Sequence, residues 1–239
     1  ETETTVPAEP VVPAEPVGNS ETVMPVVTID VGGANTENEN YKIDDTGISL
    51  LKRNVQYVLT GTTDKSVSVW GNNNSEEGLK EAHYIKLNKA TINGGIVVVN
   101  SPVKMVVEVA DGTVNTVKRL SANDLTISGS GTLNAENLGS TQRRNSYMPS
   151  KLTITDTEIN VTIDRNYAEW NGECVIGGDA KVTYTTNLDY APLHMGESAG
   201  DDNNSFTLKD NAKLYCLHQN PDQASNSSVS GLEIFYGDL

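Results

Sequence analysis

The chain has 239 residues with 17 Lys and Arg against 32 Asp and Glu, so its formal net charge is −15 at pH 7. This charge excludes a general nucleic-acid binder, because a phosphate backbone requires a basic face. No run of about 18 apolar residues occurs that would span a membrane. Only 5% of the residues are aromatic, while Thr and Asn are abundant, which favours β structure with many tight turns in one domain or at most two.

Residues 1–25 differ in composition from the rest. The motif VPAEPV occurs twice in tandem, and five of the nine prolines lie in this stretch. Proline fixes φ and removes donors, so we expect an extended, polyproline-like spacer whose glutamates add stiffness. Such a spacer suggests tethering to a surface, and the absence of a start Met and signal peptide suggests that a targeting segment is removed or not included. We therefore divide the chain into this spacer and a β domain over 26–239, with insertions after residue 136.

From residue 26, short runs alternate apolar residues with Thr, Ser or Lys, the period of a half-buried strand. The segment 75–84 has room for one helical turn and no more. In chain order, the expected strands are VVTIDV (26–31), GISLL (47–51), VQYVLTG (55–61), SVSVW (66–70), YIKL (84–87), IVVV (96–99), MVVEV (105–109), DLTIS (124–128), KLTIT (151–155), EINVTI (158–163), CVIGG (174–178), KVTYTT (181–186), SFTLK (205–209), KLYCL (213–217) and LEIFY (232–236).

A repeated unit, strand–polar turn–strand, recurs at steps of 18 to 32 residues. Internal repetition of this length is typical of a solenoid. We predict an all-β fold, a single-stranded parallel β-helix, in which a narrow core excludes bulky aromatic residues; a β-sandwich is the alternative. The six units are LNKATI (87–92), VADGTV (109–114), ISGSGTL (127–133), ITDTEI (154–159), IGGDAKV (176–182) and LKDNAKL (208–214).

Three phrases give the chain a more specific resemblance: VQYVLTGT (55–62), VVEVADGTVNTV (106–117) and SANDLTISGSGTLNAE (121–136). Over residues 45–218 the chain resembles the carbohydrate-binding β-helix domain of secreted and surface proteins of polysaccharide-degrading anaerobic bacteria. The resemblance implies a right-handed parallel β-helix like that of pectate lyases. It also implies a non-catalytic role in binding plant-type polysaccharides, with calcium as a bound ion. The irregular insertions after residue 136 depart from the family pattern.

Two sets of acidic residues are candidate calcium ligands. One is a row of aspartates in the turn of the repeat, for which turn formation is the simpler explanation, because Asp bonds its own backbone there. The other is the Gly-bearing loop 196–205, which supplies hard oxygen ligands without EF-hand spacing. The turn aspartates are Asp111, Asp156, Asp179 and Asp210, and the loop residues are Glu197, Asp201, Asp202 and Asn203.

The insertions combine aromatic rings with guanidinium groups. If successive coils bring these loops to one corner, sugar rings stack on the aromatics while hydroxyls or uronate carboxylates bond the arginines. The alternative is that Tyr and Trp cover the edge of the solenoid and Arg pairs with Asp. The candidate ligand-binding residues are Arg143, Arg144, Tyr147, Arg165, Tyr167, Trp170, Tyr190 and His194.

The remaining reactive side chains give no catalytic motif. Cys174 and Cys216 both follow strand-like patterns, which favours small buried thiols, although a disulfide would suit an exported protein. The three histidines are scattered, without a nucleophile motif or metal-type spacing.

The leading hypothesis is a non-catalytic polysaccharide-binding or adhesive module, extracellular or on a bacterial cell surface. The alternatives are a calcium-dependent lyase of uronate polymers, which needs Ca²⁺ and an Arg or Lys base, and a purely structural cell-adhesion domain.

Overall fold

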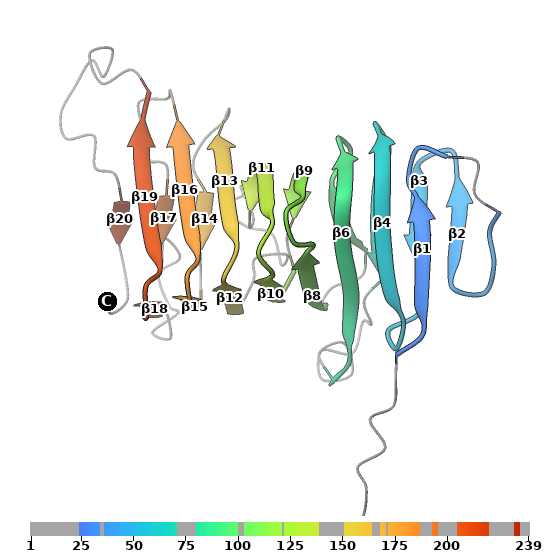
Figure 1. Ribbon diagram of the computed structural model, residues 1–239, viewed down its shortest axis with the longest axis horizontal. Coiled ribbons are helices and arrows are strands. Elements are labelled where there is room, and N and C mark those ends of the chain that lie inside the picture. The colour runs from blue at the N-terminus through green and yellow to red at the C-terminus, as the bar shows by residue number, and fades with distance from the viewer. Residues whose placement is uncertain are drawn as a thin grey trace, which may run out of the picture.

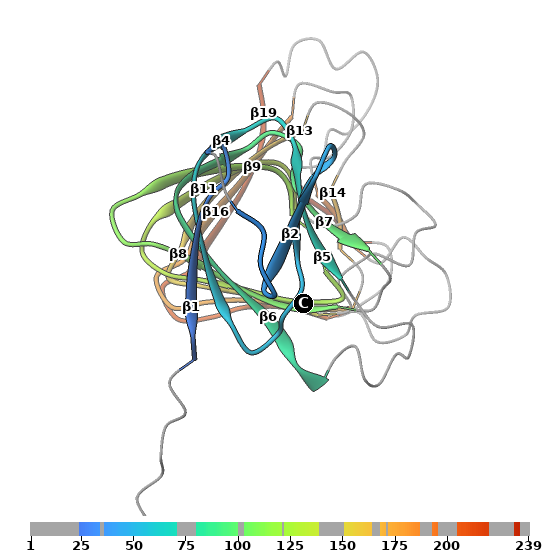
Figure 2. The same cartoon turned by 90° about the vertical axis from the view of Figure 1, so that its right-hand side faces the viewer.

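The computed structural model describes residues 24–33, 36–70, 80–99, 103–120, 122–138, 151–163, 168–170, 172–186, 193–195, 205–219 and 232–234. Nearly all of the predicted spacer lies outside these residues, so the domain division stays a prediction. Within the described residues, strands dominate and their pairing is almost entirely parallel. Successive coils stack along one axis (Figure 1), and the view along that axis shows the chain winding around a central core (Figure 2).

The first side of the solenoid is a parallel sheet whose strands follow one another from coil to coil. Its members are β1 (Val26–Asp30), β4 (Gln56–Thr63), β6 (Ala82–Ile92), β8 (Lys104–Val109), β10 (Asp124–Ser128), β12 (Lys151–Thr155), β15 (Glu173–Gly177) and β18 (Ser205–Leu208).

The second side is also parallel and begins with the C-terminal parts of β4 and β6, which are long enough to turn onto it. It continues through β9 (Val114–Leu120), β11 (Thr132–Leu138), β13 (Glu158–Ile163), β16 (Lys181–Thr186) and β19 (Lys213–His218).

The third side consists of two separate groups of parallel strands. The early coils supply β3 (Gly47–Leu50), β5 (Ser66–Trp70) and β7 (Ile96–Val99), and the last coils supply β14 (Ala168–Trp170), β17 (Leu193–Met195) and β20 (Leu232–Ile234).

The predicted all-β solenoid is therefore confirmed, and the β-sandwich alternative is wrong. A sandwich pairs its strands mainly antiparallel, whereas only β2 (Tyr41–Asp44) pairs antiparallel here, with β3, among the described residues. This hairpin lies at the N-terminal end of the stack (Figure 1).

The predicted repeat register holds for the later coils. Ile127, Ile154, Ile176 and Leu208 are successive partners on the first side. One unit was misaligned: Ile127 pairs with Val107 and not with Val109. From the first side to the second, the chain takes eight residues from Val107 to Asn115 but only six from their partners Ile127 to Leu133. Because this difference is two residues, every side chain stays on its own face.

The core consists of stacked Val, Ile and Leu columns, but the prediction that it excludes aromatic residues is wrong. Tyr57 and Tyr184 are fully buried, and Tyr41 and Phe206 are nearly so. Tyr57 lies in the N-terminal part of the stack, where its hydroxyl donates to O of Asn40 at 2.6 Å and accepts from N–H of Lys52 at 2.9 Å. The Tyr57 ring is therefore buried with its hydroxyl bonded on both sides.

Several elements differ from the sequence predictions. The strand β2 and the three-residue strands β14 and β17 were not predicted, because short polar segments such as YKID carry little periodicity. The strands β9 and β11 were anticipated only at their first residues, by the ends of the units 109–114 and 127–133. Residues 82–84, expected within a helical turn, form the start of β6, where His83 pairs with Met105 of β8.

Candidate ligand-binding surfaces

The aspartates of the repeat corner are tied into the turns. Asp156 and Asp210 have φ of 58° and 59°, in the left-handed region. One carboxylate oxygen of Asp156 accepts from N–H of Asp179 in the next coil at 2.9 Å, and one of Asp210 accepts from N–H of Gly178 at 3.0 Å. Asn211 donates from its side chain to Asp179 at 3.0 Å. Asp156 and Asp210 therefore occupy turn positions, while their carboxylates bond the neighbouring coil and not their own backbone.

Glycine at position 178 is required by this ladder. Its φ of 63° lies in the left-handed region, and a Cβ there would collide with the carboxylate of Asp156.

The calcium prediction is not tested. No three His, Cys, Asp or Glu side chains gather into a cation site among the described residues. The loop ligands Glu197, Asp201, Asp202 and Asn203 lie outside that part of the chain.

Most of the predicted sugar-binding residues also lie outside the described residues: Arg143, Arg144, Tyr147, Arg165, Tyr167 and Tyr190. The backbones of the other two are placed. Trp170 is on β14 and His194 on β17, two strands that pair on the third side with Trp170 opposite Met195 and Glu169 opposite His194. The fold thus brings the backbones of these two predicted residues to adjacent strands, one register position apart.

A row of polar side chains runs along the second side, and sequence reasoning missed it. One outward position per strand carries a hydroxyl or amide group, in unbroken register from coil to coil. We call it the Thr/Asn row; six steps of about 4.8 Å make it roughly 29 Å long. Its members are Thr62, Thr91, Thr116, Asn134, Asn160, Thr183 and Tyr215, each partly or well exposed.

The Thr/Asn row contains one hydrogen bond between its own members, and an ion pair lies on the same strands. The Asn160 side-chain amide donates to the Asn134 carbonyl oxygen at 3.2 Å. Glu158 accepts from Lys181 at 2.9 Å, and this hydrogen bond raises the pKa of Lys181 above its ordinary value. The alternation of these outward groups with fully buried neighbours such as Ile159 fixes their direction.

The first side carries a second surface, which we call the basic pocket. It has a volume of about 530 Å³. Its walls come from the start of β1, the segment before β4, the start of β6 and the start of β8. The lining residues are Met24, Pro25, Arg53, Asn54, Lys80, Glu81, Ala82, Tyr84 and Lys104.

The charge of the basic pocket contrasts with the charge of the whole chain. Arg53, Lys80 and Lys104 line it together with Glu81, the one acidic residue among its described lining residues, while the chain as a whole carries −15. Lys104 also lies 3.7 Å from Asp124 on the next strand. Sequence reasoning missed this pocket because its cations are more than twenty residues apart and belong to no motif; only the register of β6 against β8 joins them.

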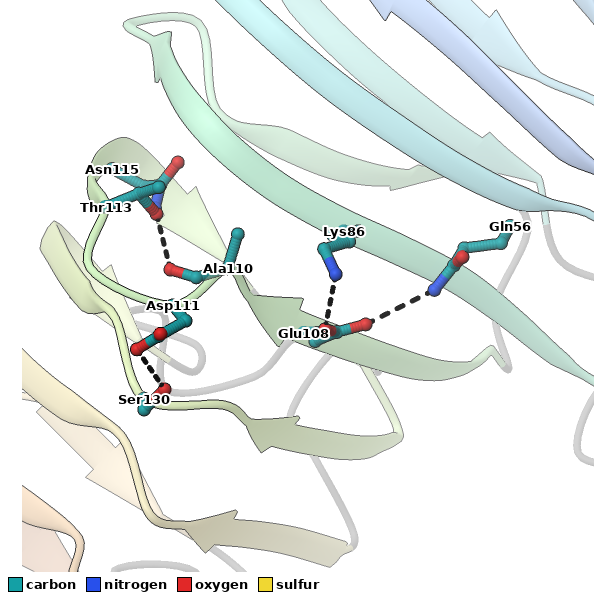
Figure 3. A network of polar contacts seen from close by, with 8 residues as sticks. All are labelled: Gln56, Lys86, Glu108, Ala110, Asp111, Thr113, Asn115 and Ser130. Atoms are coloured by element: carbon teal, nitrogen blue, oxygen red, sulfur yellow. Dashed lines mark hydrogen bonds and ion pairs between the residues drawn. The ribbon is translucent and has the colours of Figure 1, made fainter.

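Beside the basic pocket, the first side carries a polar network (Figure 3). One oxygen of Glu108 accepts from Lys86 at 2.7 Å and the other accepts from Gln56 at 3.3 Å, which joins three consecutive coils. At the following turn, Ser130 donates to Asp111 at 2.6 Å. Because both oxygens of Glu108 are engaged, we assign this carboxylate a structural role.

The strand β9, which follows this turn, carries a buried asparagine, Asn115, also drawn in Figure 3. Asn115 accepts from N–H of Ala90 at 2.9 Å and donates to the Thr113 hydroxyl at 2.8 Å, and Thr113 donates to O of Ala110 at 2.6 Å. A buried amide with its bonds satisfied fixes the register of the coils it joins.

Both cysteines are free thiols, so the structure holds no disulfide between Cys174 and Cys216. Cys174 is buried, as predicted, and burial raises its thiol pKa well above the ordinary value. Cys216 is only half-buried, and burial raises its pKa to about 11.

His83 is buried in the core at the start of β6. Its Nε2 lies 3.0 Å from O of Trp70, and because a carbonyl only accepts, Nε2 carries the proton. Burial, with a smaller contribution from the charge of Arg53, lowers the pKa of His83 to about 4, so the ring is neutral at pH 7.

Comparison of the chain with protein-family models, with curated proteins and with solved structures gave no match. The resemblance to carbohydrate-binding β-helix domains therefore stays a prediction. Among the described residues, no helix has the length and apolar character needed to cross a membrane.

Proposed function

We propose that this protein is a non-catalytic polysaccharide-binding module that acts outside a bacterial cell or on its surface. The observation that supports it is the Thr/Asn row, a straight series of hydroxyl and amide groups repeated once per coil over roughly 29 Å. A polysaccharide also presents hydroxyl groups at a constant repeat. Such a polymer forms many weak hydrogen bonds along a surface of this kind, and their number compensates for their individual weakness.

The sequence adds two supports. The Pro/Glu-rich stretch 1–25 has the composition of a spacer, which suits a module held away from a surface. The excess of acidic over basic residues keeps the module soluble and repels nucleic acids.

Affinity electrophoresis against a panel of plant-type polysaccharides tests this proposal. We expect retardation by at least one polymer, and at least a tenfold loss of affinity in Asn160→Ala/Thr183→Ala, because two adjacent groups of the row are removed. The matched control is Thr126→Ala/Thr153→Ala, which removes two in-register outward hydroxyls from the first side.

Equal losses in both double variants would contradict the assignment to the Thr/Asn row, and the absence of retardation by every polymer would contradict the function. The same samples, incubated with polygalacturonate with and without a chelator, are monitored for the absorbance of an unsaturated product. Such a product would replace the proposal by the lyase alternative. Retardation that is lost with the chelator would show that polymer binding requires a divalent cation.

A further inference from the structure

The basic pocket is a second surface with ligand-binding properties, distinct from the Thr/Asn row. Its cations come from three segments, before β4, before β6 and at the start of β8, and they converge only because the coils stack in register. Among the described residues that line this cavity, three are basic and one, Glu81, is acidic, whereas the chain as a whole carries −15.

We propose that the basic pocket binds the acidic group of a glycan, a carboxylate or a sulfate ester carried on a sugar ring. This inference rests on the proposed function, which it extends to the charge of the ligand and to a specific site. Arg53 offers a planar fork of donors for such an oxyanion, while Lys80 and Lys104 add point charges. Asn54 supplies amide groups for hydroxyls, and the ring of Tyr84 offers an apolar face for sugar C–H groups.

The size of the pocket agrees with this ligand. A volume of about 530 Å³ lies within the range of pockets that hold small molecules, so one or two sugar rings fit. The pocket is partly open to solvent, where salt screens charge with a Debye length of about 10 Å at 0.1 M. We therefore expect the preference for an acidic sugar to be largest at low ionic strength.

The experiment titrates the full chain with three monosaccharides at low salt and follows binding by NMR: galacturonate, galactose 6-sulfate and galactose. We expect at least one anionic sugar to bind at least tenfold more tightly than galactose, and 0.5 M salt to abolish this difference. The test variant is Lys80→Gln/Lys104→Gln, which should bind all three sugars about equally. Circular dichroism confirms folding, and Arg53→Gln is the second variant if Lys80→Gln/Lys104→Gln does not fold.

The matched control is Lys181→Gln/Lys213→Gln, at the opposite end of the solenoid. It removes two lysine charges from the chain, as the test variant does, and breaks the ion pair of Lys181 with Glu158 at 2.9 Å. We expect it to keep the preference for the anionic sugar, because neither lysine lines the basic pocket.

Equal binding of the three sugars by the natural chain, or a preference that survives in Lys80→Gln/Lys104→Gln, overturns the inference. Its failure is distinguishable from failure of the proposed function. If no polymer binds but the anionic sugar is still preferred, the role of the Thr/Asn row is rejected and the role of the pocket stands. If polymers bind but no anionic sugar is preferred, the role of the pocket is rejected and the role of the row stands. Preference for the sulfate or for the carboxylate tells which acidic group the pocket takes.

Discussion

The two ends of the solenoid differ in how well they cover their cores. At the N-terminal end, the β2–β3 hairpin lies over the first coils, and both Tyr41, on β2 itself, and Tyr57, on β4, are buried. On the last coil, Leu208 of β18 is 46% exposed, although its partner Ile176 one coil earlier is fully buried. An inward position is therefore not buried by its own coil; it is buried by the coil that follows.

The residues of one column show this directly. Leu133, Ile159, Val182 and Leu214 are successive partners on the second side. The first three are fully buried, while Leu214 on the last strand is only half-buried. The same apolar side chain in the same column thus contributes less to stability at the C-terminal end.

The largest expected effect comes from truncating that column at two places. Leu133→Ala should lower the free energy of unfolding by about 2–5 kcal/mol, since it leaves a cavity between two packed coils. Leu214→Ala should cost less than half as much, because solvent already reaches the site. Urea unfolding of both variants measures the difference. Equal costs would mean that the last coil is as well packed as the middle of the stack.

A pH titration examines the early coils. Folded His83 stays neutral down to about pH 4, whereas in the unfolded chain it takes up a proton near pH 6.5. Its contribution to stability is complete above pH 6.5 and is lost as the pH falls towards 4, by about 3 kcal/mol at 1.4 kcal/mol per pH unit. Urea unfolding between pH 4 and 7 should show this loss in the natural chain, and a smaller loss in His83→Gln. If the free energy of unfolding falls equally with pH in the natural chain and in His83→Gln, His83 is hydrated in the folded protein.

A pair of tyrosine variants compares the stability contributed by the two ends of the solenoid. Tyr57→Phe removes a hydroxyl bonded to O of Asn40 and N–H of Lys52, so about 1–3 kcal/mol of stability should be lost. Tyr215→Phe removes the hydroxyl of a ring that is 39% exposed on the last coil, and its cost should be within about 0.5 kcal/mol. Thermal unfolding ranks the two variants. The reverse order would place the better-ordered end at the C-terminus.

The smallest effect is a difference in labelling rate that leaves stability unchanged. Cys216 on the last coil should react slowly with a thiol reagent at pH 8, because it is half-buried and its pKa is raised to about 11. Cys174, one coil earlier on the first side and buried, should react only after unfolding. Mass spectrometry of the labelled peptides follows both sites. Faster labelling of Cys174 would show that the solenoid opens near β15 more readily than at its C-terminal end.

The sequence predicted most of the fold because the information is local. Alternation in runs such as KLTIT and EINVTI sets strand, face and turn within a few residues, and its recurrence from Ile127 through Leu208 predicted the stacking register. The aromatic residues were misjudged, since composition does not reveal that Tyr57 finds partners for its hydroxyl within the stack.

The candidate sites were harder to predict because they join residues from different coils. The aspartate corner was predicted as turn chemistry, and the left-handed φ of Asp156 and Asp210 agrees with it, but the bonds of their carboxylates to the neighbouring coil appear only in the structure. The basic pocket was not foreseen, since nothing local relates Arg53 to Lys104 before β4, β6 and β8 are aligned.

The sequence by itself thus determined the secondary structure, the solenoid and the chemistry of the turns, because these depend on contacts within a few residues and on their repetition. The tertiary structure alone decided which outward side chains lie together and how deeply each inward side chain is buried. The physical reason is that coil lengths vary, so residues separated by about twenty positions in one coil and by more than thirty in another become neighbours only through the parallel register.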